Sequence, residues 1–225
     1  MANIIFDITD TLKIIDRNKR KKQFLKMLQL TNKTKPINIE SFMHAYMRHY
    51  KKLNNGIILN DNEFLSKLFL YFKIKLSKKE LKKIQKFHIN CRRKFVSLAP
   101  FGKKILILLK KKKHKISILS NEVERFAELD WKSLRINSKK MFKIKSYASY
   151  KNSMKPNKLA FIKIAKKLKC KPSQSFMIGN SYLHDIIPAK EIGMKTIFLN
   201  LKRRKNNKKA DFIIKSLNEI PKIVD

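Results

Sequence analysis

The sequence predicts an α/β fold in which a mostly parallel sheet carries an inserted all-helical domain. Three observations lead to this prediction. In the second half of the chain, short apolar segments alternate with helical patterns of roughly ten to fifteen residues, as in βαβ units. A further apolar segment of the same kind stands at the start, and the residues between carry only helical periodicity. Hydrophobic residues make up 43 % of the 225 residues, which is enough for a substantial core.

The first element is a strand predicted over residues 3–8, where the sequence Asn-Ile-Ile-Phe-Asp-Ile runs into a polar loop. From about residue 17 to residue 95, apolar residues recur at three- and four-residue spacing, which predicts about four amphipathic helices. Ser77, followed three residues later by Glu80, has the pattern of a capping box at the start of one of these helices. This region carries no strand signal.

Strands and helices alternate after residue 96. Strands are expected at 115–120, 142–145, 174–179, 195–199 and 211–214, and helices at 103–112, 157–168, 183–192 and from 216 onward. The first strand belongs with this part, because it ends in the same kind of polar loop. We therefore assign residues 1–14 and 96–225 to an α/β core domain and residues 15–95 to a helical domain inserted into it.

The composition is strongly basic, with 55 Lys and Arg against 16 Asp and Glu and a formal net charge of +39. Such a charge is compatible with nucleic acid as a partner. The lysines are spread along the whole chain, however, so a general lysine bias is the favoured interpretation. No apolar run reaches the roughly 18 residues of a membrane span, and the start of the chain lacks the pattern of a secretory signal. Two distant cysteines, Cys91 and Cys170, cannot form a disulfide scaffold. We expect a cytoplasmic protein with no membrane partner, and the sequence carries no signal of oligomeric state.

Polar residues follow several of the predicted strands directly. Ligands of an open parallel sheet bind at the carboxyl ends of its strands, so these residues are expected to converge at one edge. The convergence would bring together two carboxylates, a hydroxyl group, two amides and a lysine. The residues are Asp7, Ser120, Asn121, Lys155, Asn180 and Asp185.

In this order, the residues resemble the motifs of the haloacid dehalogenase-like hydrolase superfamily. Residues 6–12, Phe-Asp-Ile-Thr-Asp-Thr-Leu, are similar to its first motif, F-D-x-D-G-T-L. Ser120 is similar to the second motif, Lys155-Pro156 to the third, and residues 179–185 to the fourth, G-D-S-x-x-N-D. The helical insertion between the first two motifs resembles the type-one cap of the family. The resemblance implies a Rossmann-like, doubly wound parallel sheet with an inserted all-helical cap.

The resemblance also implies a phosphatase that acts on a small phosphorylated metabolite. Asp7 would be the nucleophile and would form an aspartyl-phosphate. Ser120, with Asn121 beside it, would hydrogen-bond the transferring group. Lys155 would offset the negative charge of nucleophile and phosphate. Thr9 would stand where the family has its general acid and base, an aspartate.

The cofactor implied by the resemblance is Mg²⁺, bound by oxygen ligands. The ligands would be Asp7, the carbonyl group of Thr9, Asn180 and Asp185. Asn180 replaces the leading metal-binding aspartate of the family, so the site would lose one negative charge.

The threonine at position 9 leads us to expect that the aspartyl-phosphate breaks down slowly. A threonine hydroxyl does not titrate near neutral pH, and general acid–base catalysis typically contributes about 10²–10⁴-fold. Strand alternation puts Asp7 and Thr9 on the same side of the chain, so Asp10 is not expected to take over the role.

Two alternatives stay open. Thr9 and Asn180 also fit a metal-independent 2-haloacid dehalogenase, since that branch lacks the second aspartate and has asparagine in the fourth motif. A hydrolase fold that has lost efficient chemistry and binds an anionic partner, such as nucleic acid, through its lysines is the third interpretation. Candidates for facing the site from the cap lie on one predicted helix: His44, Tyr46, Arg48 and His49.

Overall fold

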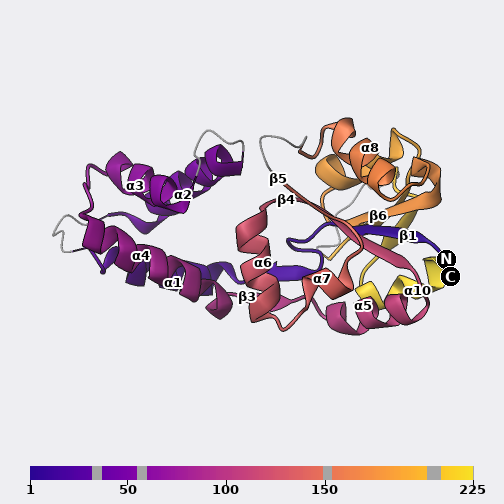
Figure 1. The fold of residues 1–225 in the computed structure, drawn as a ribbon, viewed down its shortest axis with the longest axis horizontal. Helices are drawn as coiled ribbons and strands as arrows, with labels where there is room; N and C mark the ends of the chain where they lie inside the picture. Colours follow the sequence, from indigo (N-terminus) through magenta and orange to yellow (C-terminus); the bar gives the residue numbers. More distant parts are fainter. Residues whose placement is uncertain (32–36, 55–59, 149–153, 202–208, 225) are drawn as a thin grey trace.

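The structure is a computed structural model that describes residues 1–31, 37–54, 60–148, 154–201 and 209–224. It contains a six-stranded sheet covered by helices and, beside it, a group of four helices (Figure 1). The α/β class and the Rossmann-like parallel sheet are confirmed. Within the described residues, no helix has the length and apolar character needed to cross a membrane.

The strands of the sheet lie in the order β5-β4-β1-β6-β7-β8, and every pairing among them is parallel. Phe6 of β1 pairs with Ile118 of β4 on one side and with Ile178 of β6 on the other, so the first strand lies in the middle. The strands are β1 (Asn3–Phe6), β4 (Lys115–Val123), β5 (Lys145–Ala148), β6 (Ser175–Gly179), β7 (Lys195–Leu199) and β8 (Phe212–Ile214).

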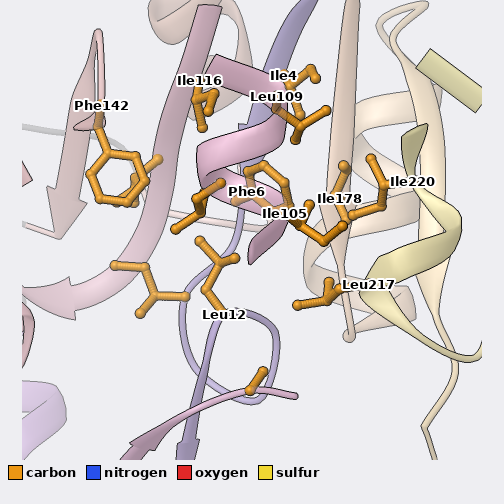
Figure 2. Packing of buried hydrophobic residues seen from close by; sticks show 14 of the residues in the cluster. Ile4, Phe6, Leu12, Ile105, Leu109, Ile116, Phe142, Ile178, Leu217 and Ile220 are labelled. Carbon is orange, nitrogen blue, oxygen red and sulfur yellow. The ribbon is translucent and has the colours of Figure 1, made fainter. Parts of the chain in front are cut away.

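Helices cover both faces of the sheet, as strand alternation requires. Ile4 and Phe6 of β1 face a cluster that includes Ile105 and Leu109 of α5 and residues near the chain end (Figure 2). Ile5 points the opposite way and packs among apolar residues of α8. The helices of this part are α5 (Gly102–Lys111), α6 (Glu124–Ser133), α7 (Ser138–Met141), α8 (Lys158–Lys167), α9 (Ile187–Lys190) and α10 (Pro221–Val224).

The four predicted helices between residues 17 and 95 are present and share an aromatic core of their own. The rings of Phe24 and Phe42 meet edge to face with their centroids 5.9 Å apart. The capping box is confirmed: the Ser77 amide donates to Glu80 at 2.8 Å, and the Glu80 amide donates to the Ser77 hydroxyl at 3.2 Å. We call α1 (Arg17–Leu28), α2 (Ile39–Asn54), α3 (Asp61–Tyr71) and α4 (Lys78–Cys91) the helical group.

A two-stranded antiparallel ribbon joins the helical group to the sheet. It consists of β2 (Lys13–Ile15) and β3 (Val96–Leu98). The sequence analysis did not predict it, because three residues are too few to show a period. The domain boundaries at 14/15 and 95/96 stay a prediction.

A buried ion-pair network lies at the same junction. Lys13 Nζ is 2.5 Å from Glu122 and 2.6 Å from Asp130, and Arg92 lies 3.0 Å and 2.8 Å from the same two carboxylates. Two cations therefore balance two anions where the ribbon, the end of the helical group and the sheet domain meet.

Several predicted boundaries differ from the structure. The first strand ends at Phe6, the strand expected at 142–145 is β5 (Lys145–Ala148), and the chain from residue 216 forms a 3₁₀ turn before the short α10. α6 and α7 were not predicted, although Phe126, Ala127 and Trp131 of α6 follow helical spacing.

The helix expected at 183–192 is a π-helical turn, Tyr182–Ile186, followed by α9. Pro188 has no amide hydrogen to donate to the carbonyl group of His184, so a regular α-helix cannot run through this point.

Candidate active site

The structure brings the seven predicted site residues to one cavity. Its volume is about 820 Å³, and it extends from the carboxyl ends of β1, β4 and β6 to residues of the helical group. The convergence expected from parallel strands is therefore present. The seven lining residues are Asp7, Thr9, Ser120, Asn121, Lys155, Asn180 and Asp185.

Lys155 is the centre of the charged cluster. Its Nζ lies 2.7 Å from Asp7 Oδ1 and 2.5 Å from Asp185 Oδ1, and its side chain is 3 % exposed. Burial alone would lower the pKa of Lys155, but the carboxylates of Asp185 and Asp7 outweigh burial and raise the pKa above its ordinary value. Lys155 therefore carries its positive charge at neutral pH.

Asp185 is held firmly on the other side of this lysine. Its second oxygen, Oδ2, accepts a hydrogen bond from the Ser181 amide at 2.9 Å, so both carboxylate oxygens have partners. Gly179 makes this arrangement sterically feasible, because a Cβ atom added there would lie 2.3 Å from Asp185 Oδ2. Burial raises the pKa of Asp185 to about 6, although Lys155 acts in the opposite direction.

Asn121 fixes the backbone of the lysine. Its Nδ2 donates to the Lys155 carbonyl group at 2.6 Å, and its Oδ1 accepts from the Lys155 amide at 2.9 Å. The Ser120 hydroxyl accepts from the Glu122 amide at 3.2 Å, and because Ser120 lines the cavity its own hydrogen can be donated to a bound group there.

Thr11 is a site residue that the sequence analysis did not single out. Its fully buried hydroxyl lies 3.1 Å from Asp7 Oδ2 and 3.3 Å from Asn180 Oδ1, and its one hydrogen can be donated to one of them at a time. Its place within the first motif was the available signal. Thr11 thus contacts one oxygen of the Asp7 carboxylate, and Lys155 contacts the other.

Asp10 lines the cavity together with Thr9. β1 ends at Phe6, so the alternation of side chains along a strand does not decide where the side chain of Asp10 points. Asp10 adopts a φ of +59° at the position where the first motif has glycine. Aspartate is one of the side chains that tolerate this conformation, which explains how the loop keeps its shape without glycine.

The helical group supplies the opposite wall. Of the four candidates on α2, His44 and Tyr46 line the cavity. Arg48 instead lies over the ring of Tyr71, with its guanidinium carbon 5.7 Å from the ring centroid. His49 binds the Ala45 carbonyl group at 2.8 Å. Further lining residues from the helical group were not predicted, namely Arg17, Arg20, Glu40, Met43, Met47 and Tyr50, and Arg92 lines the cavity just after α4.

Oxygen atoms dominate the donors that could hold a metal ion. Among the described residues, no three His, Cys, Asp or Glu side chains are grouped as a metal site. Asp7 Oδ2 and Asn180 Oδ1, however, lie close enough to contact the same hydroxyl group. One carboxylate oxygen and one amide oxygen at such a spot suit the oxygen preference of Mg²⁺.

The fold, the ordered strand-end residues and the helical insertion are all characteristic of one family. The profile of the family described as haloacid dehalogenase-like hydrolase matches residues 4–199. The chain belongs to this family. It is 31 % identical over 110 residues to a glyceraldehyde 3-phosphate phosphatase of Methanothermobacter thermautotrophicus, an alignment that covers 48 % of this chain and 47 % of that protein.

A second curated relative and a solved structure are also similar to this chain. A glyceraldehyde 3-phosphate phosphatase of Pyrococcus furiosus is 23 % identical over 143 residues, which cover 60 % of this chain and 58 % of that protein. The chain thus spans about half the length of these curated relatives. The crystal structure of a 2-haloacid dehalogenase from Pseudomonas syringae pv. Tomato superimposes with a TM-score of 0.75 at 17 % identity, covering 99 % of this chain and 97 % of that one. This last likeness shows the fold.

Proposed function

We propose that this chain is a magnesium-dependent phosphatase that hydrolyses small phosphomonoesters through an aspartyl-phosphate on Asp7. The observation that carries the proposal is the Asp7 carboxylate, held at the cavity wall by buried Lys155 at 2.7 Å. The similarity to curated phosphatases of a small phosphorylated aldehyde supports the same reaction.

In the first step, a carboxylate oxygen of Asp7 attacks phosphorus. The bond from phosphorus to Asp7 forms, the bond to the ester oxygen breaks, and the alcohol leaves with a proton taken from solvent or from a group at the cavity. Lys155 and Thr11 each hold one carboxylate oxygen, which fixes the direction of attack. The charge of Lys155 offsets the negative charge on the phosphoryl group, and the Ser120 hydroxyl donates to one of its oxygens.

In the second step, water attacks the phosphorus of the aspartyl-phosphate, inorganic phosphate leaves, and the Asp7 carboxylate is restored. The side chain of Thr9 supplies no titrating group for this water. We therefore infer that this step limits the rate. We also infer that residues 15–95 act as the cap that covers the site.

Mg²⁺ would be held by Asp7, Asn180 and the Thr9 carbonyl group, with Asp185 contributing negative charge from behind Lys155. When bound, the ion would offset the charge of the phosphate. Asp185 is the least exposed of the four predicted ligands, with 1 % of the residue exposed against 7 % for Asp7, and both of its oxygens are hydrogen-bonded.

The test is a phosphate-release assay over a panel of phosphomonoesters, with Mg²⁺ or with EDTA. Asp7→Asn should abolish release, because an amide is not a nucleophile here. Asp16→Asn is the matched control: the side chain of Asp16 caps α1 outside the cavity, and asparagine caps helices equally well. Phosphate release by Asp7→Asn at the wild-type rate would refute the proposal.

A second candidate function is metal-independent dehalogenation of a 2-haloacid. The presence of neutral Thr9 and Asn180 at the cavity favours it, because halide departure needs no general acid. Chloride release from 2-chloropropionate in EDTA, without phosphate release from any ester, would establish this function instead.

A further inference from the structure

Arg20 of α1 lines the cavity from the helical group, and its charge lacks a partner. Its Nε atom is buried and makes no hydrogen bond, and the described residues place no carboxylate within ion-pair distance of the guanidinium. Burial lowers the pKa of Arg20, an effect that nearby Tyr46 and Asp10 do not offset. The protein surroundings thus leave this cation uncompensated.

The other buried cations of the cavity wall are compensated. Lys155 sits between two carboxylates, and Arg92 is paired with Glu122 and Asp130. Arg17 and Arg92 also lower the pKa of Arg20, so neighbouring cations add to the effect of burial. This contrast sets Arg20 apart from its neighbours.

An unpaired, partly buried guanidinium is costly, and an anion that binds to it removes the cost. Arginine presents several N–H groups in a planar fork that matches the oxygens of a carboxylate or a phosphate. Arg20 and Asp7 line the same cavity from the helical group and from the sheet. A molecule whose phosphate reacts at Asp7 could therefore place a second group at Arg20.

We infer that Arg20 binds a second anionic group of the substrate, so that the preferred substrate is a small phosphomonoester that also carries a carboxylate or a second phosphate. This inference rests on the proposed phosphatase function and narrows its substrate class. It makes Arg20 a specificity-determining residue that takes no part in the chemical step.

The experiment compares substrates that differ by one anionic group. 2-Phosphoglycolate is paired with 2-hydroxyethyl phosphate, and fructose 1,6-bisphosphate with fructose 6-phosphate. The kcat/KM of each is measured for the wild type, Arg20→Met, Arg20→Lys and Arg93→Met. Arg93 is an exposed arginine outside the cavity and serves as the matched control.

We expect the wild type to prefer at least one of the two doubly anionic esters over its partner. Arg20→Met should lower kcat/KM for that ester by about 10- to 100-fold, the size of a charge-assisted hydrogen bond, and change the partner by less than about threefold. Arg20→Lys should recover part of the loss, and Arg93→Met should lose nothing. The substrate pair in which Arg20→Met lowers kcat/KM shows whether Arg20 binds a carboxylate or a second phosphate.

Equal losses for both members of each pair, or no loss, would overturn the inference while leaving the phosphatase function intact. If the wild type releases no phosphate from any ester, the proposed function fails, and calorimetric titration with 2-phosphoglycolate and 2-hydroxyethyl phosphate decides the subsite separately. Tighter binding of 2-phosphoglycolate that disappears in Arg20→Met would support the subsite, and equal binding of the two would refute it.

Discussion

His88 should make this protein lose stability as the pH falls from 7 to 5. The side chain lies in α4, is 1 % exposed, and packs among the rings of Tyr46, Phe64 and Phe126. Its Nε2 lies 2.8 Å from the Tyr46 hydroxyl, whereas Nδ1 is buried without a hydrogen-bond partner. A second proton on this ring would therefore be placed in an apolar pocket with nothing to receive it.

Burial lowers the pKa of His88 from 6.5 to about 3, and the positive charges of Arg92 and Arg125 act in the same direction. The unfolded chain binds a proton below pH 6.5, while the folded chain keeps the ring neutral down to about pH 3. Stability is therefore lost as the pH falls through this window. At 1.36 kcal/mol for each pKa unit, the loss is about 2 kcal/mol at pH 5 and approaches about 5 kcal/mol at pH 3.

Urea unfolding at pH 7, 6 and 5 measures this loss of stability. The variant His88→Gln separates the contribution of His88 from that of the other titrating groups. Glutamine does not titrate and can still hydrogen-bond Tyr46. The variant will be less stable than the wild type at pH 7, but the difference between the two should shrink by about 2 kcal/mol at pH 5. All other titrating groups are common to both proteins. A stability difference that is the same at pH 7 and pH 5 would refute the reasoning.

Three further predictions concern the junction and the site. Arg92→Met removes one cation of the buried network and should cost about 3–5 kcal/mol in urea unfolding, whereas exposed Arg93→Met should stay within about 0.5 kcal/mol. Thr9→Asp should raise kcat at least about tenfold and abolish any burst of bound phosphate in rapid quench; an unchanged kcat would show that loss of the acid is not limiting. Asn180→Asp should lower the Mg²⁺ concentration that gives half-maximal activity, and no shift would argue against Asn180 as a ligand.

The sequence predicted those helices and strands that carry a clear pattern of apolar residues. Strands such as β6 and β7 each contain three consecutive apolar residues and lie within a residue of their expected positions. The β2–β3 ribbon is held by pairing across more than 80 residues of chain, and three residues on each side carry no local signal. The π-helical turn before Pro188 depends on one missing amide hydrogen, which periodicity does not register.

The site residues also divide into those with a local sequence signal and those without one. Asp7 and Asn180, which directly follow β1 and β6, were placed at the cavity correctly, because parallel strands bring their carboxyl ends to one edge. Thr11 and Arg20 were missed for different reasons. Thr11 stood inside the quoted motif without an assigned role, and Arg20 is one of many basic residues in a basic helix. Only its burial distinguishes it, and burial is a tertiary property.

The balance of buried charge connects the basic composition with the proposed chemistry. Of the buried acidic residues, four are paired with three buried cations, Lys13, Arg92 and Lys155. The network at the junction is neutral, so the single excess negative charge falls on the pair of carboxylates around Lys155. In the proposed reaction, a phosphate dianion would approach a group of three side chains with net charge −1, Asp7, Lys155 and Asp185, inside a chain of net charge +39. The basic surface raises the local concentration of such anions, and under the proposed function a bound Mg²⁺ at Asp7 would offset the remaining negative charge. An aspartate in place of Asn180 would bind that cation more tightly and would also repel the phosphate more strongly before the cation arrives.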